Sequence, residues 1–199
     1  MAGIPSPFGR SDDDLFDAYD EFVPEHLPAP GPALAGHDVL AGREHLAFHR
    51  CTRACFEERT VYDMTFGYNL ARLNLDSRHE DAGYRYAVES DDPAVLRAEF
   101  TPTTPFCPQT HTLTIGSFRA WNGLRDRHEF DLVRVRAAEM HHQATAINER
   151  LVALEEAFLE TGDVREAAAR VDGVDAEADT GSAGGAATVG GTDADAAPF

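Results

Sequence analysis

Large side chains recur at intervals of three or four residues in two stretches of the chain. From 43 to 62 no glycine or proline interrupts the spacing, which is carried by Leu46, His49, Arg53 and Phe56. A second stripe, ended by Gly162, consists of Ala144, Ile147, Leu151, Leu154 and Phe158. Such spacing turns one face of a helix toward a core. The pattern predicts helices over 43–62 and from 144 to Gly162.

Shorter apolar or alternating runs predict strands. Two of them, 85–88 and 95–100, flank the turn-forming tetrapeptide Ser-Asp-Asp-Pro at 90–93, so we expect a β-hairpin. The run FDLVRV at 130–135 alternates cleanly and predicts a third strand.

The segment after Pro108 has two interpretations. Threonines alternate with Leu113 and Ile115, as in a strand, whereas Ile115, Phe118 and Trp121 would share one helix face. Proline is favoured in the first turn of a helix. We therefore predict a helix from Pro108 to about Asn122.

These elements predict an α/β or α+β fold, a small compact domain whose short mixed or antiparallel sheet is packed by two or three helices. We expect a Pro/Gly-rich, acidic and largely extended arm over 1–42, a helical extension over 43–62 and the α/β domain over 63–162. The remaining segment, 163–199, is acidic and rich in glycine and alanine, and is predicted to be a disordered tail.

The net charge of the chain narrows the classes of molecule that it is expected to bind. The 199 residues have a net charge of −18, and all 17 basic residues are arginines. Residues 1–30 hold seven acids and one arginine, and residues 171–199 hold six acids and no base, so both ends are expected to be solvated. Such acidity is typical of salt-adapted, halophilic proteins, which negative charge keeps soluble. With no basic patch, nucleic acid is not an expected partner.

No apolar run approaches the length of a membrane helix, and no signal pattern precedes the chain's first polar segment, so no membrane partner is expected. Three cysteines, an odd number, favour free thiols in a reducing cytoplasm.

One of these cysteines has an unusual setting. Cys107 lies between Pro105 and Pro108 in the run FTPTTPFCP, directly after a predicted strand and before a predicted helix. The unpaired N–H groups of a helix start stabilise a thiolate and leave its sulfur accessible. A reactive thiol is therefore expected at Cys107; the alternative is a small buried side chain at a proline-fixed turn.

Three blocks of sequence resemble the metal–sulfur cluster assembly family, which includes SufT- and PaaD-type proteins and the eukaryotic targeting factors of cytosolic iron–sulfur protein assembly. They are AEFTPTTPFCP at 98–108, HEFDLVRVR at 128–136 and HHQATAINERLVALEEAF at 141–158. The resemblance covers about 60–160, but the family's Asp-Pro loop is not recognisable between 62 and 86. It implies a compact α/β domain in which Cys107 is the reactive cysteine.

The resemblance also implies a role in iron–sulfur protein maturation, with assembly proteins or client apoproteins as partners and iron or an iron–sulfur cluster as a transient cargo. A second copy of the chain is a further candidate partner. We expect an adaptor or carrier that acts through its thiol, with turnover of a substrate not required. The alternatives are an accessory subunit of a PaaD-type oxygenase complex, a cysteine-dependent enzyme, and a purely structural partner with an inert Cys107.

Polar residues near Cys107 are candidate ligands. The hydroxyls of Thr101, Thr103 and Thr104 could bind a ligand at the turn, or could satisfy backbone groups among the prolines. His111 and His142 could join Cys107 in a soft-metal site if the two helix starts converge. His141 precedes His142, and adjacent side chains point apart, so at most one of the two would serve.

A second group has metal-like spacing on the helix predicted over 43–62. His45 and His49 are four residues apart, as are Cys51 and Cys55, but at about 100° per residue the two pairs fall on opposite sides of the helix. A single four-ligand site would require a break in the helix. We expect the cysteines to be core residues and the histidines to be solvated.

Overall fold

The computed structural model describes residues 15–181, with side chains described to residue 173. The strands are β1 (Asp38–Val39), β2 (Tyr62–Asp63), β3 (Tyr68–Asn69), β4 (Gly83–Val88), β5 (Val95–Thr101) and β6 (Leu132–Ala137). The α-helices are α1 (Gly42–Arg59), α2 (Thr110–Gly123), α3 (Ala144–Thr161) and α4 (Val164–Gly181). Short 3-10 turns are η2 (Pro24–His26), η3 (Pro32–Leu34), η4 (Leu70–Leu75) and η5 (Arg125–Arg127).

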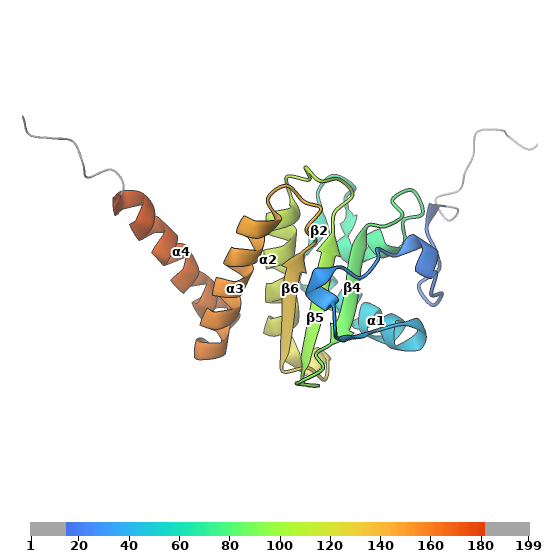
Figure 1. The fold of residues 1–199 in the computed structure, drawn as a ribbon, viewed down its shortest axis with the longest axis horizontal. Helices are drawn as coiled ribbons and strands as arrows, with labels where there is room; N and C mark the ends of the chain where they lie inside the picture. Colours follow the sequence, from blue (N-terminus) through green and yellow to red (C-terminus); the bar gives the residue numbers. More distant parts are fainter. Residues whose placement is uncertain (1–14, 182–199) are drawn as a thin grey trace, which may run out of the picture.

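A four-stranded mixed sheet in the order β1-β4-β5-β6 forms the centre (Figure 1). The predicted hairpin is confirmed, because β4 and β5 pair antiparallel from Gly83 opposite Thr101 to Val88 opposite Leu96. The predicted third strand is also confirmed as β6, which runs parallel to β5 after the crossover through α2. A two-stranded sheet, β2-β3, lies apart. The expected compact α+β domain with a mixed sheet is thus confirmed.

The core lies between one face of this sheet and helices α1 and α2. Tyr84, Tyr86 and Phe100 point from the strands into it, and Trp121 of α2 is fully buried with its ring edge-on to Tyr84 at 5.1 Å. On α1, Phe56 packs 4.9 Å from the same indole. The helix expected after Pro108 is thereby confirmed, since aromatic burial outweighs the strand propensity of its threonines. Helix α1 is part of the core rather than an extension.

The outer edge of β6 is closed by two asparagines. Asn122 of α2 binds both the N–H and the C=O of Val133, at 2.9 Å each. Asn148 of α3 binds those of Ala137 at 2.8 and 3.0 Å. These side chains replace a neighbouring strand, so α2 and α3 are tied to the edge on which the sheet would otherwise continue.

The N-terminal arm packs against the sheet instead of standing free in solvent. Its described part has short turns and β1, and Leu27, Leu34 and Leu40 are buried. The carboxylate of Glu99 accepts the N–H of Ala33 at 2.9 Å. A Cβ on Gly31 would stand 2.0 Å from that carboxylate, so the close approach requires glycine. The largely extended arm predicted over 1–42 is therefore not a free appendage in its described part, although most of its side chains remain at the surface. Residues 1–14 lie outside the described part.

The disorder predicted from residue 163 onward is also wrong for its first half, where α4 continues to Gly181. Asp163 accepts the N–H groups of Arg165 and Glu166 at 2.7 and 3.0 Å, which caps the helix start. Ala167 and Ala168 are buried against the domain. Alanine is the strongest helix former, so the composition that suggested a tail also suits a helix. Residues 182–199 lie outside the described part.

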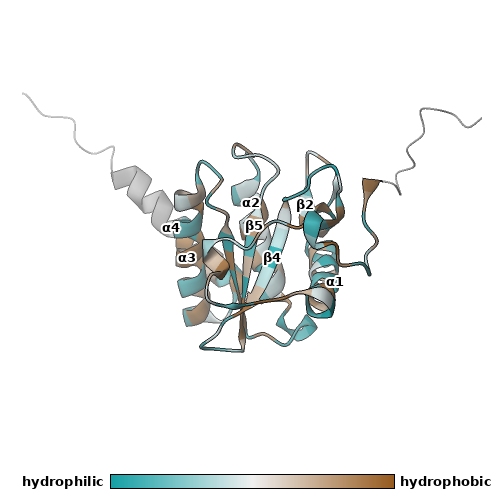
Figure 2. Cartoon of the chain, turned by 45° about the vertical axis from the view of Figure 1, so that its right-hand side comes forward, coloured by the Kyte–Doolittle hydropathy of each residue, from teal (hydrophilic) through white to brown (hydrophobic). Residues whose placement is uncertain are grey.

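Figure 2 shows α1 and α3 with alternating hydrophilic and hydrophobic segments, as amphipathic helices have. None of the described helices is both long and apolar enough to cross a membrane.

Candidate functional site at the Cys107 turn

Cys107 lies in the turn that joins β5 to α2. Its N–H donates to the carbonyl of Thr104 at 3.3 Å, and its own carbonyl accepts the N–H of Thr110, the first residue of α2, at 3.3 Å. Its thiol is half-buried and not in a disulfide. The predicted turn between a strand and a helix is observed, but α2 begins at Thr110, so Cys107 lies outside the helix start rather than directly before it.

The start of α3 meets this turn. The ring Nε2 of His141 lies 3.0 Å from the carbonyl oxygen of Cys107. Both the backbone N–H and the ring Nδ1 of His142 bond the carbonyl oxygen of Pro105, at 2.9 and 2.8 Å. The two helix starts therefore converge, above the carboxyl ends of the parallel strands β5 and β6 (Figure 1). In α/β sheets, ligands bind at this end of parallel strands.

The histidines divide into a buried and an exposed one. His141 is 3 % exposed and bridges to the backbone of Cys107, whereas His142 is exposed and stacks near Phe106, with ring centres 5.2 Å apart. The sequence pointed to His142 as a candidate ligand, whereas in the structure it is His141 that bonds the backbone of Cys107. Only the meeting of the two loops reveals which ring faces inward, and no local signal in the sequence carries that information.

The other candidate ligands do not form one group with Cys107 in the described part of the chain. Among the described contacts, the hydroxyls of Thr101, Thr103 and Thr104 make no hydrogen bond. The side chain of His111 lies on the exposed side of α2. Partial desolvation of its ring lowers its pKa, and the nearby positive charge of Arg150 acts in the same direction. No three His, Cys, Asp or Glu side chains in the described part form a metal-ligand group, so the predicted set of Cys107, His111 and His142 is not assembled in one chain.

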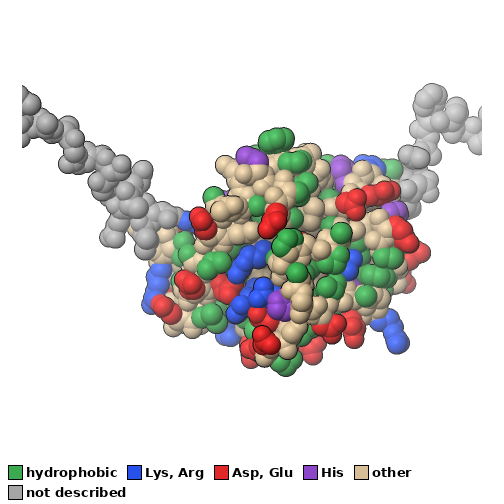
Figure 3. Space-filling model, in the orientation of Figure 1, with side chains coloured by type: hydrophobic (Ala, Val, Ile, Leu, Met, Phe, Trp, Pro, Cys, Tyr) green, Lys and Arg blue, Asp and Glu red, His purple; other side chains and the backbone are tan. Residues whose placement is uncertain are grey.

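Exposed apolar side chains surround the turn. Phe106 is 71 % exposed and Met64 is 80 % exposed. The loop of Met64 is tied to the turn by its N–H, which donates to Gln109 at 2.9 Å. Met140, in the loop before α3, is also exposed. Figure 3 shows hydrophobic side chains at this upper end of the molecule. We call Met64, Phe106, Cys107 and Met140 the Cys107 surface.

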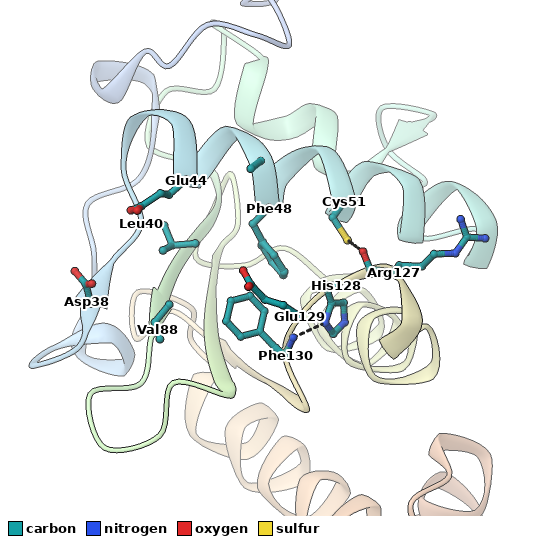
Figure 4. A pocket seen from close by; sticks show the side chains of 11 residues that line it. Asp38, Leu40, Glu44, Phe48, Cys51, Val88, Arg127, His128, Glu129 and Phe130 are labelled. Atoms are coloured by element: carbon teal, nitrogen blue, oxygen red, sulfur yellow. Dashed lines mark hydrogen bonds between the residues drawn. The ribbon is translucent and has the colours of Figure 1, made fainter.

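A second thiol setting lies on α1. A cavity of about 380 Å³ has Leu40, Phe48 and Phe130 among its apolar walls, with Cys51 and Arg127 at one end (Figure 4). The thiol of Cys51 donates to the carbonyl of Arg127 at 3.3 Å, and its Sγ lies 3.8 Å from Sγ of Cys55. Cys55 is buried, as predicted for both cysteines; Cys51 instead borders the cavity.

The expected solvation of His45 and His49 is wrong. Both are buried, and the rings stack 5.6 Å apart. His49 bonds the hydroxyl of Tyr86 at 3.0 Å and the carbonyl of Ala71 at 2.9 Å. Burial lowers the pKa of His49 to about 4 and that of His45 to about 3, so both rings are neutral at neutral pH. The arm and η4 cover this side of α1, which the helix's own sequence cannot reveal.

Comparison with known proteins gives one match. Residues 14–165 match a family model described as a domain of unknown function, DUF7998. No curated protein and no solved structure matches the chain.

Proposed function

We propose that this chain, which belongs to the DUF7998 family, a domain of unknown function, is an adaptor or carrier in the maturation of iron–sulfur proteins. In this proposal the Cys107 surface meets the partner protein, and the thiol of Cys107 is the group presented to it. Assembly proteins and client apoproteins are the proposed partners.

The observation that carries the proposal is the pairing of an accessible thiol with exposed apolar side chains on a braced turn. Phe106 precedes Cys107 and is 71 % exposed, and Met64 is held beside the turn through Gln109. Exposed aromatic and methionine side chains are enriched in protein interfaces. The turn is braced by His141 and His142, so it can present its side chains in one conformation before a partner arrives.

The resemblance to the metal–sulfur cluster assembly family supplies the chemistry. Its first block, AEFTPTTPFCP, covers the end of β5 and the turn, and its third block covers the loop before α3 and most of that helix. These blocks, 34 residues apart at Cys107 and His141, are joined by a hydrogen bond. Their contact supports treating them as parts of one site.

The described residues suit an adaptor better than a resident metal centre. Cys107 supplies one thiol, and each neighbouring histidine uses a ring nitrogen on a backbone carbonyl. Iron or a cluster is therefore proposed as cargo, for which the partner or a second copy would supply the remaining ligands. A soft metal with thiolate ligands needs three or four of them.

The enzymatic alternative has less support. A neighbouring base within hydrogen-bond reach of the sulfur is one way in which a protein activates a cysteine as a nucleophile. His141, the buried histidine at this turn, bonds the carbonyl oxygen of Cys107. An accessory role in a PaaD-type oxygenase complex uses the same Cys107 surface and differs only in the partner.

The deciding experiment is anaerobic capture of partners from the native cell extract at the cell's own salt concentration. Wild type, Cys107→Ser and Phe106→Ala are compared, with Cys51→Ser as the matched thiol control. We expect iron–sulfur proteins among the partners of wild type and Cys51→Ser, with recovery falling at least about tenfold in the other two. Partners without iron–sulfur proteins, or capture unaffected by Cys107→Ser, would contradict the proposal; recovery of a multicomponent oxygenase would favour the PaaD-type alternative.

Anaerobic incubation with ferrous iron and sulfide separates carrier from adaptor. Visible absorbance that is present in wild type and lost in Cys107→Ser indicates a carrier. Absence of iron uptake by wild type restricts the proposal to an adaptor.

A further inference from the structure

The two cysteines of α1 form a pair of thiols with different access to solvent. They are one helical turn apart, and their sulfur atoms are separated by 3.8 Å. Cys51 borders the cavity formed with Phe48 and Phe130 (Figure 4). Cys55 does not line this cavity and is 1 % exposed. A reactant that enters the cavity can therefore reach the first sulfur, and only the first sulfur can reach the second.

The electrostatic setting of the two thiols also differs. The hydrogen bond from Cys55 lowers the pKa of Cys51 despite its partial burial, and the Arg127 guanidinium acts in the same direction. The same hydrogen bond and burial raise the pKa of Cys55 well above its usual value. The neutral thiol of Cys51 donates a hydrogen bond to the carbonyl of Arg127, and this bond favours the protonated form. The hydrogen bond from Cys55 favours the thiolate and outweighs it, so the pKa of Cys51 is lowered.

We propose that Cys51 and Cys55 are a redox pair that reduces a small hydroperoxide in the cavity and closes to a disulfide. Cys51 attacks the distal oxygen as a thiolate, after losing its proton to water. An S–O bond forms, the O–O bond breaks, and the departing oxygen takes a proton to leave as water or an alcohol. The sulfur of Cys51 becomes a sulfenic acid.

Cys55 then completes the reaction. Its sulfur attacks the sulfenic sulfur, an S–S bond forms and the S–O bond breaks, and the hydroxide leaves as water with the thiol proton of Cys55. Overall, two thiols are oxidised by two electrons and one hydroperoxide is reduced by two electrons.

The bond requires a local change in the helix. Residues four apart on a helix have Cα atoms about 6 Å apart, within the range of about 4.4–6.8 Å that disulfides span. The Cβ atoms of residues four apart on a helix are about 5–6 Å apart, farther than the roughly 3.5–4.5 Å of a disulfide. The helix must therefore unwind locally around residues 51–55 while the sulfur atoms approach from 3.8 Å to about 2 Å.

This pair is separate from the Cys107 surface. Cys107 precedes the first residue of α2, and Arg127 follows its last. A helix of 14 residues is about 21 Å long. The redox proposal therefore does not depend on the proposed adaptor function, and Cys107 serves as an internal control.

The positions of three arginines around the two cysteines allow disulfide formation to be tested directly in the full chain. Trypsin cleaves after Arg50, Arg53 and Arg59, so Cys51 and Cys55 fall on separate peptides, 51–53 and 54–59. The folded protein is treated with one equivalent of hydrogen peroxide, the remaining thiols are alkylated at low pH, and the digest is analysed by mass spectrometry. We expect the two peptides to be joined by a disulfide at least about tenfold faster than Cys107 is oxidised.

Two variants test the order of events. In Cys55→Ala, which keeps a small apolar side chain in the core, the sulfenic acid on Cys51 should persist and be trapped by dimedone. In Cys51→Ala, Cys55 should stay reduced. The proposal is overturned if no linked peptide forms, or if Cys55 is oxidised without Cys51.

Discussion

The Cys107 turn and the Cys51–Cys55 pair lie at opposite ends of α2 and hold their thiols in different ways. Cys107 lies on a loop whose conformation depends on prolines and on two histidines that bond its backbone. Cys51 and Cys55 lie on a regular helix, with their sulfur atoms 3.8 Å apart and Phe48 packed beside them. The first setting places a single thiol among exposed side chains, which suits contact with another protein. The second combines two thiols with a cavity, which suits chemistry on a small molecule.

The two regions differ in the exposure of their side chains and in whether a second thiol lies beside the first. An exposed turn needs its neighbours mainly to fix the backbone, so its exposed side chains can be replaced at little cost in stability. A helix that lines a cavity must keep its packing, because the same residues form the core. Three predictions test this contrast.

The largest expected difference concerns the two phenylalanines next to the thiols. Phe48 is 6 % exposed, with its ring 4.9 Å from Tyr86 and 5.7 Å from Phe130. Phe48→Ala should lower the free energy of unfolding by about 3–5 kcal/mol. Phe106→Ala, at an exposed side chain, should change it by less than about 0.5 kcal/mol. Urea unfolding at constant salt measures both, and losses of similar size would show that the turn is as tightly packed as the helix.

Acid should weaken the α1 side of the domain. The unfolded chain protonates His49 near pH 6.5, whereas burial lowers its folded pKa to about 4. The folded state therefore binds fewer protons between these values, and stability that is complete above pH 6.5 is lost as pH falls. From pH 7 to 5 the loss due to His49 is about 2 kcal/mol, and His45 acts in the same direction.

Unfolding curves at several pH values check this expectation. His49→Gln should flatten the dependence, while His142→Gln, at the exposed end of the Cys107 turn, should retain it. An unchanged slope in His49→Gln would mean that other groups determine the acid sensitivity.

The smallest expected difference lies within the Cys107 turn itself. His141 is buried and bonds the carbonyl of Cys107, so His141→Ala should cost about 1–2 kcal/mol and speed hydrogen exchange at the N–H of Thr110. His142→Ala should cost less than about 1 kcal/mol, because its ring is exposed to competing water. Equal costs would indicate that both histidines brace the turn to the same degree.

Much of the fold could be predicted from local patterns. The Ser90–Pro93 turn and the runs beside it identified the hairpin, and alternation at 130–135 identified β6 within two residues of its observed start. Pro108 led to the correct prediction of a helix in a segment whose threonines favour a strand. The position of Cys107 before that helix followed from the same proline. In each case the controlling interactions lie within a few residues.

The candidate site was predicted less completely. Cys107 and the two histidines were singled out, but the inward orientation of His141 depends on how the loop after β6 reaches Pro105 and Cys107. The asymmetry of Cys51 and Cys55 arises from residues 127–130, which fold back from the end of α2. The helix over 164–181 was missed because alanine-rich composition fits both a tail and a helix, and Ala167 and Ala168 are ordered by packing.

Local sequence patterns are enough to give the order and kind of the central elements, the acidity of the chain and the position of one thiol before a helix. Those properties depend on backbone preferences and on periodicity, which act over a few residues. Which histidines are buried, which cysteine borders a cavity and which helix starts converge became clear from the packed fold. These depend on desolvation and packing between segments far apart in the chain, and no single segment carries the information about what will cover it.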